Sequence, residues 1–307
     1  MSCALITHPD CRRHEMGEGH PECPERLDAI SDFLLATRVM PYLAPCDAPL
    51  ATREQLARAH TAGYVAQTFA AAPTEGYLRL DPDTSMNPYT LAAAQRAAGA
   101  AIAGAEMVVR GEFRRAFCAV RPPGHHATRD QAMGFCIFNN VAVGIRHALN
   151  VLGLERVALV DFDVHHGNGS EDILAGDERV LMVSTFQSGL YPFLGDLPRG
   201  ENMVNVGLPA GADGEALRRA YTDAWLPALE RFRPQLLFIS AGFDAHRADD
   251  MASLRFVESD YAWITNELVA LAERHCEGRI VSCLEGGYNL FHLARSAAEH
   301  VRALAGI

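Results

Sequence analysis

Residues 157–168 read Val-Ala-Leu-Val-Asp-Phe-Asp-Val-His-His-Gly-Asn. The first four residues are all apolar, which is typical of a strand that is covered on both faces of a sheet. Asp161, Asp163 and His165 follow at every second position, so an extended chain points their three side chains to one side. The stretch therefore predicts a buried strand that ends in a group of oxygen and nitrogen ligands.

The same arrangement recurs along the chain. Further apolar runs occur at Ala116–Val120, Val180–Ser184, Leu236–Ser240 and Ile280–Leu284. Helix-like segments between or before them are Thr90–Val109, Val141–Val151, Glu215–Phe232 and Ser259–Arg274. Alternation of buried strands with helices predicts a parallel sheet with helices on both faces. No linker or repeat divides residues 1–307, so we expect a single domain.

Polar clusters follow the apolar runs, at the point where each predicted strand ends. The clusters that accompany the one at Asp161 are Arg121-Pro122-Pro123-Gly124-His125-His126, Ala241-Gly242-Phe243-Asp244 and Glu285-Gly286-Gly287-Tyr288. In open α/β sheets the ligand crevice lies outside the carboxyl ends of the strands. We therefore expect these distant segments to form one site.

A metal centre is the first chemistry that these residues indicate. Asp161, Asp163 and His165 form a half-site that Asp244 can complete, and three protein ligands with an open position are typical of a catalytic zinc. The alternative is a strand end that is merely capped by hydrogen bonds. Asp161 also has two uses that remain open, as a metal ligand or as the partner of a histidine ring nitrogen.

Acid–base and oxyanion groups are the second indication. His125 and His126 follow a rigid Pro-Pro-Gly turn and are candidates for a general base and a general acid. Tyr288 follows two glycines, so its phenol is a candidate oxyanion donor, although a plain turn with a packed aromatic is the alternative. Phe135 and Tyr191 are candidates for an apolar entrance or, equally, for core packing.

Composition narrows the class of protein. Lys and Arg total 27 against 38 Asp and Glu, a formal charge of −11 that disfavours a nucleic acid or an anionic membrane as partner. No apolar stretch is long enough to span a bilayer. The eight cysteines include no C-x-x-C pair, so a reduced, cytoplasmic enzyme is expected. No nucleophile elbow or phosphate-binding loop follows a strand.

Together these motifs resemble the zinc-dependent histone deacetylase family, including its bacterial deacetylase and acetylpolyamine amidohydrolase relatives. The matching stretches are Gly19–Leu27, Arg121–His126, Gly134–Asn140, Asp161–Gly169, Ser240–Asp244 and Glu285–Asn289. They occur in the family's order over nearly the whole chain. The resemblance implies an arginase/deacetylase-like fold, which is a three-layer α/β/α sandwich with a central, mainly parallel sheet.

The resemblance also implies a catalytic centre. It assigns one Zn²⁺ per chain to three ligands, which are Asp163, His165 and Asp244. It assigns the reaction to His126 as general base and then acid, His125 as its electrostatic partner and Tyr288 as the oxyanion donor.

Further roles follow from the same resemblance. Asp161 orients His125 and, with Ser184 and Thr185, is similar to the family's structural potassium site. The walls of the acyl-lysine channel correspond to Gly134, Phe135 and Tyr191.

The chain departs from the family pattern at three places, one of which is Phe186, where a His is common. Asn168 stands where class I members carry a second Asp behind the general base, as in class II-like members. A neutral partner favours the protonated form of His126 less, so that this ring is readier to act as a base near neutral pH. The frequent Asp-Pro-Leu becomes Asp249-Asp250-Met251. Polyamine-selective relatives tend to have an acidic residue at the position of Met251, so this residue favours acyl-lysine, whereas Asp249 and Asp250 keep a polyamine open.

The expected function is hydrolysis of N-acetylated lysine side chains or related acetylated amines by metal-activated water. The alternatives are an acetylpolyamine amidohydrolase, a binuclear manganese ureohydrolase of the arginase type and a binding module that has lost activity. A homo-oligomer stays open. Most other histidines, such as His60, His147 and His275, are expected on the surface of helices.

Overall fold

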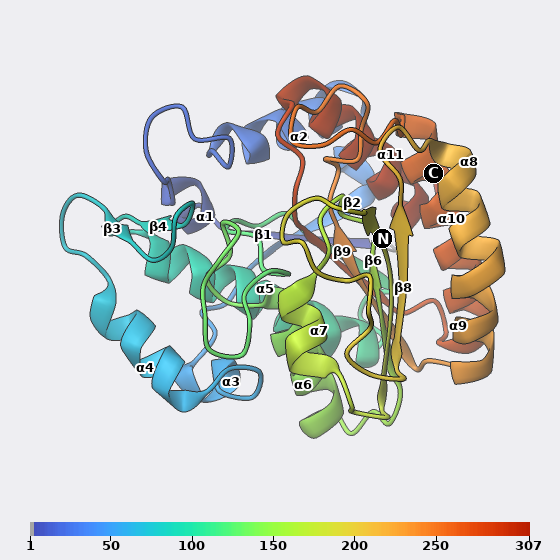
Figure 1. Ribbon diagram of the computed structural model, residues 1–307, viewed down its shortest axis with the longest axis horizontal. Coiled ribbons are helices and arrows are strands. Elements are labelled where there is room, and N and C mark those ends of the chain that lie inside the picture. Colours follow the sequence, from blue (N-terminus) through green and yellow to red (C-terminus); the bar gives the residue numbers. More distant parts are fainter. Residues whose placement is uncertain (1–2) are drawn as a thin grey trace.

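An eight-stranded sheet lies between two layers of helices in the computed structural model, which describes residues 3–307 (Figure 1). The strand order is β2-β1-β5-β10-β9-β6-β7-β8, and every neighbouring pair is parallel. The strands are β1 (Cys3–Thr7), β2 (Leu43–Asp47), β5 (Arg115–Cys118), β6 (Val157–Asp161), β7 (Val180–Gln187), β8 (Met203–Leu208), β9 (Leu236–Ala241) and β10 (Ile280–Leu284). A separate antiparallel pair consists of β3 (Leu78–Arg79) and β4 (Ser85–Met86).

Helices cover both faces of the sheet. They are α1 (Asp10–Arg13), α2 (Glu25–Ala36), α3 (Arg53–Leu56), α4 (Ala62–Ala71), α5 (Thr90–Val109), α6 (Asn140–Asn150), α7 (Asn168–Leu174), α8 (Gly214–Ala220), α9 (Leu226–Phe232), α10 (Glu258–His275) and α11 (Leu290–Ala305). Helix α5 packs on α6 and α1 on one face, and α11 packs on α10 and α2 on the other (Figure 1). The predicted sheet with helices on both faces is confirmed.

The central strands explain why the apolar runs are continuous. Every residue of β5, β6, β7, β9 and β10 is buried, because helices cover the sheet on both sides. Burying one Val or Leu side chain contributes about 1.5–3 kcal/mol, so these strands form much of the hydrophobic core.

One predicted helix is interrupted. The segment Glu215–Phe232 was expected to be continuous, but it divides into α8, a π-helical turn η2 (Tyr221–Trp225) and α9. Pro227 lies in the first turn of α9 and has no backbone N–H, so a regular α-helix cannot run through this position. By contrast, the predicted bounds of α5 and the structure agree.

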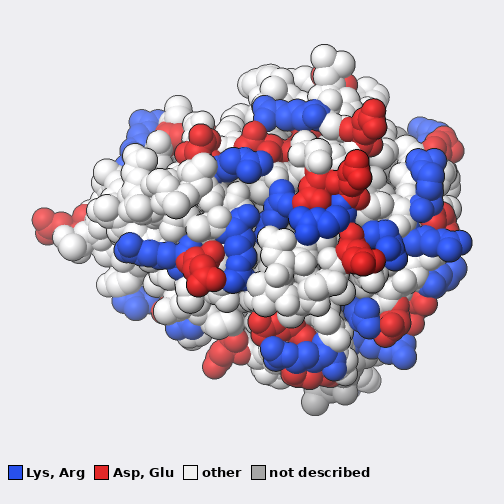
Figure 2. All heavy atoms as spheres, turned by 90° about the horizontal axis from the view of Figure 1, so that it is seen from below, with Lys and Arg blue, Asp and Glu red and all other residues white. Residues whose placement is uncertain are grey.

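The strand order places the polar clusters together. Strands β5, β10, β9 and β6 are consecutive in the sheet, so the segments that follow them leave the same edge side by side. None of the helices within residues 3–307 combines the length and the apolar character that a membrane span needs. On the face drawn in Figure 2, basic and acidic side chains are interspersed.

Candidate active site

Hydrogen bonds from backbone N–H groups join the loops that follow β6, β9 and β10. The Phe243 N–H donates to the Gly286 carbonyl at 3.0 Å, and the Gly286 N–H donates to Asp163 Oδ2 at 2.8 Å. The Val164 N–H donates to Asp244 Oδ1 at 3.0 Å. Three segments that lie far apart in sequence are therefore fixed against one another.

Asp163, His165 and Asp244 meet where these loops join. Each offers a ligand atom, and the three atoms lie within 4.8 Å of one another. His165 Nδ1 is 3.2 Å from Asp163 Oδ1 and 3.2 Å from Asp244 Oδ2. All three residues are buried, and Asp244 Oδ2 has no hydrogen-bond partner among residues 3–307. The predicted ligand trio is thus assembled as a compact, buried group.

The charges of this trio require a cation. Burial, together with the Asp163 carboxylate, raises the pKa of Asp244 to about 6. Burial opposes charge on His165, but the hydrogen bond to Asp163 and the nearby Asp244 carboxylate outweigh it and raise the pKa of His165 to about 10. Two buried carboxylates therefore draw positive charge to this point, either as a proton or as a metal ion. An Asp-His-Asp set with an unpaired buried oxygen fits a zinc ion.

Two glycines make room for the carboxylates. A Cβ atom at Gly242 would overlap the Asp163 carboxylate, and one at Gly286 would overlap that of Asp244. Neither position tolerates a side chain without displacing a ligand. The Gly-Gly pair before Tyr288 thus serves close packing against the Asp244 and Asp163 carboxylates as well as the turn.

Asp161 lies against His125 and not in the ligand trio. Its Oδ2 is 3.1 Å from His125 Nδ1, and its Oδ1 accepts the Asp163 N–H at 3.1 Å. Burial opposes charge on His125, but the carboxylates of Asp163 and Asp161 raise its pKa to about 10. The sequence left Asp161 open as a metal ligand or as the partner of a histidine ring nitrogen. The geometry favours the second use, in which Asp161 helps to keep His125 protonated.

His126 is held in the opposite state. Its Nδ1 is 2.8 Å from Asn168 Oδ1, an acceptor, so Nδ1 carries the proton and Nε2 keeps its lone pair. Burial and the neighbouring His125 and His165 cations lower the pKa of His126 well below its ordinary value. The ring centroids of His125 and His126 lie 4.0 Å apart. A neutral His126 beside a charged His125 can accept a proton.

A cavity of about 230 Å³ leads to this group. It is lined by Asp83, His126, Gly134, Phe135, His165, Leu190, Tyr191, Met251 and Tyr288. The predicted wall residues Gly134, Phe135, Tyr191 and Met251 all line it. Gly134 has φ +56°, and a Cβ there would overlap the His126 ring, so only glycine fits beside this imidazole.

Tyr288 lies in the wall of the same cavity. Its ring centroid is 5.8 Å from that of Phe135, and the Arg26 guanidinium carbon lies 4.9 Å from its ring centroid. Burial raises the pKa of Tyr288 well above its ordinary value. The phenol therefore keeps its proton and can donate it in a hydrogen bond.

Glu285 is a site residue to which the sequence reasoning assigned no role. Its Oε2 accepts the N–H groups of Gly124 at 2.7 Å and His125 at 3.1 Å, and its Oε1 accepts the Ser240 hydroxyl at 3.2 Å. Burial raises its pKa to about 7. One sequence signal could have indicated this supporting role. Glu285 comes directly after an apolar strand and before Gly-Gly.

A buried ion cluster around Glu22 was also missed. The Glu22 carboxylate accepts hydrogen bonds from Arg121 and, at 3.1 Å, from Arg26 Nη1. Arg26 Nε donates to the Gly287 carbonyl at 2.6 Å, and Arg121 Nη1 donates to the His14 carbonyl at 3.0 Å. The cluster ties the N-terminal loop to the loop that carries Tyr288.

Ser184 and Thr185 lie beside Asp161. Ser184 is the register partner of Asp161 on β7, and both β7 residues are buried. The Ser184 carbonyl accepts the Trp225 indole N–H at 3.3 Å, and its hydroxyl lies 3.3 Å from Asn205 Oδ1. Ser184 is adjacent to Asp161 as expected, while its carbonyl and hydroxyl oxygens have protein partners.

The expected surface positions of His60 and His147 are wrong. Both residues are buried. His60 Nε2 accepts the Asn139 N–H at 2.9 Å and its Nδ1 is 2.9 Å from the Thr128 carbonyl, whereas His147 Nε2 is 3.0 Å from Glu106. Polar partners from other elements allow these imidazoles into the interior. His275 is partly exposed.

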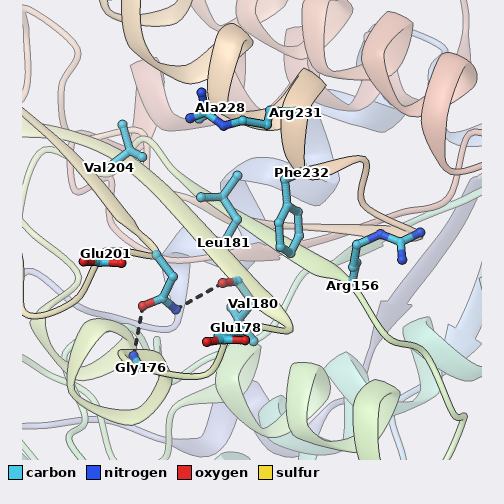
Figure 3. Close-up of a pocket in the computed structure, with 11 residues that line it drawn as sticks. Arg156, Gly176, Glu178, Val180, Leu181, Glu201, Val204, Ala228, Arg231 and Phe232 are labelled. Atoms are coloured by element: carbon cyan, nitrogen blue, oxygen red, sulfur yellow. Dashed lines mark hydrogen bonds between the residues drawn. The ribbon is translucent and has the colours of Figure 1, made fainter.

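A larger cavity, of about 630 Å³, lies at the amino ends of β7 and β8 (Figure 3). Arg156, Glu178, Glu201 and Arg231 line it together with apolar residues. Its polar groups do not include the combination of metal ligands and imidazoles found at the opposite edge of the sheet. The smaller cavity is therefore the candidate active site.

Comparison with known proteins agrees with this assignment. The model of the histone deacetylase domain matches residues 20–304. The chain therefore belongs to the histone deacetylase domain family. It is a hydrolase of the histone deacetylase-like amidohydrolase kind, a family in which zinc dependence is general.

Relatives and a solved structure cover most of the chain. A histone deacetylase-like amidohydrolase of Pseudomonas aeruginosa is 38% identical over 94% of this chain and 78% of its own length. Histone deacetylase 14, chloroplastic, of Arabidopsis thaliana is 36% identical over 94% of this chain and 74% of its own length. The crystal structure of the HDA15 HD domain covers 99% of this chain and 88% of its own, with a TM-score of 0.93 and 33% identity.

Proposed function

We propose that this protein is a zinc-dependent deacylase that hydrolyses the amide of N-acetylated lysine side chains or related acetylated amines. The observation that carries the proposal is the cavity of about 230 Å³, whose largely apolar wall leads to His126 and His165. A slender aliphatic chain with an amide at its end suits such a space. Asp163, His165 and Asp244 are the residues that would hold one zinc ion per chain.

The protein's own residues divide the work of the reaction. A bound zinc ion would supply Lewis acidity and would lower the pKa of a coordinated water to about 7. His126 Nε2 accepts a proton from the attacking water and later delivers it to the departing amine. His125, kept protonated by Asp161, adds positive charge beside His126. The Tyr288 phenol donates a hydrogen bond to the acyl oxygen as it becomes an oxyanion.

The residues that line the cavity favour one class of substrate over another. Phe135, Tyr191 and Met251 offer apolar surface to a methylene chain, which favours acyl-lysine. Asp83 lines the same cavity, and a carboxylate there would suit a second amine on an acetylated polyamine. The acetylpolyamine amidohydrolase is for this reason the second candidate.

A side-by-side comparison of kcat/KM separates the two candidates. The panel contains acetyl-lysine peptides, acetylated polyamines and lysines with longer acyl chains. We expect the peptides to be the better substrates, with acetylated polyamines at least about tenfold poorer. A preference of that size for acetylated polyamines would replace the first candidate with the second.

Metal stoichiometry tests the ureohydrolase alternative. A binuclear manganese centre requires further ligands, whereas Asp161 is engaged with His125 and Asn168 is neutral. We therefore expect one zinc per chain by elemental analysis, and two divalent metal ions per chain would revive the alternative. A structural potassium ion at Asp161, Ser184 and Thr185, a single domain over residues 1–307 and a cytoplasmic location remain predictions from the sequence.

A further inference from the structure

The loop that follows the third ligand is fastened to the loop that carries Tyr288. Asp249 is buried, and its Oδ2 accepts the N–H groups of Tyr288 at 2.6 Å and Asn289 at 3.0 Å. Its Oδ1 accepts the Met251 N–H at 3.1 Å. One carboxylate thus satisfies three backbone donors on two sides of the cavity wall.

Other contacts support the same junction. Asn289 caps α11 through the His292 N–H, and its Nδ2 donates to the Ala248 carbonyl at 3.0 Å. The backbone N–H of Asp249 donates to the His246 carbonyl at 2.9 Å. The loop at residues 244–251 therefore holds Asp249 in one orientation toward the Tyr288 backbone.

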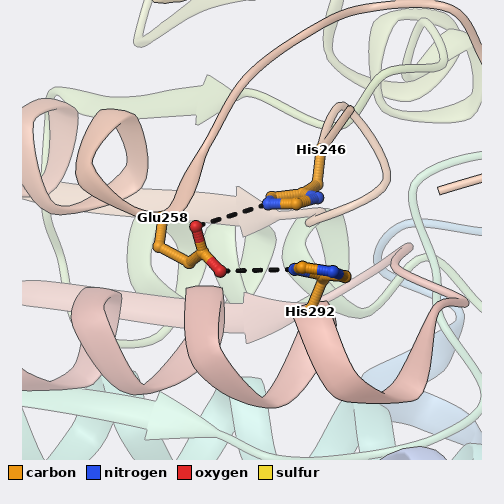
Figure 4. A group of neighbouring side chains, drawn as sticks. All are labelled: His246, Glu258 and His292. Atoms are coloured by element: carbon orange, nitrogen blue, oxygen red, sulfur yellow. Dashed lines mark hydrogen bonds and ion pairs between the residues drawn. The ribbon is translucent and has the colours of Figure 1, made fainter. Parts of the chain in front are cut away.

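A cluster of His246, Glu258 and His292 holds that loop from outside (Figure 4). His246 Nδ1 accepts the Ala248 N–H at 3.1 Å, so the neutral ring carries its proton on Nε2, which is 3.5 Å from Glu258 Oε2. His292 Nδ1 lies 3.3 Å from Glu258 Oε1, and the two rings stack with centroids 4.3 Å apart. The Glu258 carboxylate lies close to both imidazoles, so the cluster brings the loop, α10 and α11 together.

We propose that Asp249 is a positioning residue that sets the location of the Tyr288 phenol through the backbone N–H groups of Tyr288 and Asn289. This inference rests on the proposed function, because it concerns the oxyanion donor of that reaction. The glycines at 286 and 287 before Tyr288 leave the backbone few side-chain contacts of its own. On the other side, Arg26 holds the Gly287 carbonyl. Asp249 supplies the restraint next to Tyr288 itself.

Kinetics of matched variants test this role. Asp249→Ala removes all three bonds, and we expect kcat for an acetyl-lysine peptide to fall about 10²-fold with little change in KM, as for a misplaced catalytic group. Asp249→Asn keeps one acceptor oxygen, so a smaller loss, about tenfold, is expected. The matched control is Asp250→Asn, because Asp250 is exposed and its side chain has no hydrogen bond within residues 3–307. It should retain the parent kcat.

A double-mutant cycle distinguishes positioning from general loss of structure. If Asp249 acts through the phenol, Asp249→Ala in the Tyr288→Phe background should cost less than about threefold further in kcat. If the kcat loss of the double variant equals the product of the two single-variant losses, the proposal is overturned. An Asp249→Ala variant whose kcat equals that of Asp250→Asn would also overturn the proposal.

Amide hydrogen exchange gives a readout that does not depend on activity. Asp249→Ala should speed exchange in the peptide that spans residues 285–292, whereas Asp250→Asn should not. If the alanine variant does not fold, the same measurement on Asp249→Asn decides, and unchanged exchange there would overturn the proposal. If the parent protein lacks deacylase activity but exchange responds as expected, the proposed function fails while the restraint on Tyr288 stands.

Discussion

His125 and His126 are adjacent in sequence, yet their surroundings favour opposite protonation states. Asp161 and Asp163 face His125 and raise its pKa, whereas the partner of His126 Nδ1 is the neutral amide of Asn168. Environments that push the pKa values of neighbouring groups apart are typical of acid–base sites. Identical side chains can therefore have different roles at this site.

Replacement of Tyr288 tests the oxyanion donor. Tyr288→Phe removes one hydroxyl and leaves the ring packing with Phe135. We expect kcat to fall about 10²- to 10³-fold, as when one oxyanion donor is lost, while the zinc content stays unchanged. Steady-state kinetics with elemental analysis measures both. Unaltered turnover would remove Tyr288 from the account.

Glu22 is expected to matter for stability. Glu22→Gln leaves Arg121 and Arg26 buried without a carboxylate, which should cost about 3–5 kcal/mol in the free energy of unfolding. Glu18→Gln, on the exposed part of the same loop, is the control. Urea unfolding measures the difference, and equal stability of the two variants would contradict the prediction.

Glu22 also gives a pH dependence with a definite sign. Burial opposes its charge, but the Arg121 guanidinium and the other cations lower its pKa below the ordinary value of 4.5. A depressed folded-state pKa contributes stability above pH 4.5, and this stability is lost as pH falls below that value. The wild-type protein should therefore lose stability more steeply than Glu22→Gln between about pH 5 and pH 3. If the free energy of unfolding falls equally with pH in both proteins, Glu22 does not have this role.

At the residue scale, periodicity along one strand predicted that Asp163 and His165 lie together, but not which residues support them. Asp163 and His165 follow one strand with a period of two, so local sequence suffices to pair them. Glu285 braces Gly124 and Glu22 pairs with Arg121 across more than ninety residues of sequence. No local pattern encodes such distant partners, because the fold has to bring them together first.

At the scale of elements, the ends of the strands carry the chemistry. The turn after β10 passes so close to the ligands that Gly286→Ala should push a methyl group into the Asp244 carboxylate. We expect zinc affinity to fall about 10- to 100-fold, as for other changes to groups that orient metal ligands. A zinc titration against a chromogenic chelator measures the affinity.

Gly63→Ala is the matched control for that variant. Gly63 lies in α4, and a Cβ there would meet no atom within 4 Å. Its zinc affinity should equal that of the parent protein. Equal affinity for Gly286→Ala and Gly63→Ala would contradict the close packing of the turn against the ligands.

Elements with a strong pattern were predicted well, and those set by context were not. Helix α5 was predicted at its observed bounds because it is long and rich in alanine. The edge strands β2 and β8 were missed, since they are only partly buried and have no continuous apolar run. Strand β1 was missed as well, although it is largely buried and pairs with β2 on one side and β5 on the other. Pro227 alone did not reveal that the segment Glu215–Phe232 contains a π-helical turn.

At the scale of the whole molecule, the order of strands makes the site. Strands β5, β10, β9 and β6 are neighbours although other elements separate them in sequence. The rule that ligands bind at the carboxyl ends of parallel strands predicted that their clusters converge. It could not predict the strand order, which depends on packing across the sheet.

The composition offers a direct assay of the proposed reaction. All 27 basic residues counted as Lys or Arg are arginines, so the chain has no lysine side chain. After the reaction is stopped, an amine-reactive dye can label the lysine amine that is freed from an acetyl-lysine peptide. The enzyme itself contributes little background, because it has no lysine side chains. The same readout serves the acetyl-lysine peptides and the longer acyl-lysines of the panel.

The central claim is that hydrolysis of the acyl amide depends on a single zinc ion at Asp163, His165 and Asp244. The direct measurement is the rate of amine release from an acetyl-lysine peptide after treatment with a chelator and again after addition of Zn²⁺. We predict that the chelator abolishes the activity and that one equivalent of Zn²⁺ per chain restores it. Activity that survives removal of the metal would contradict the claim.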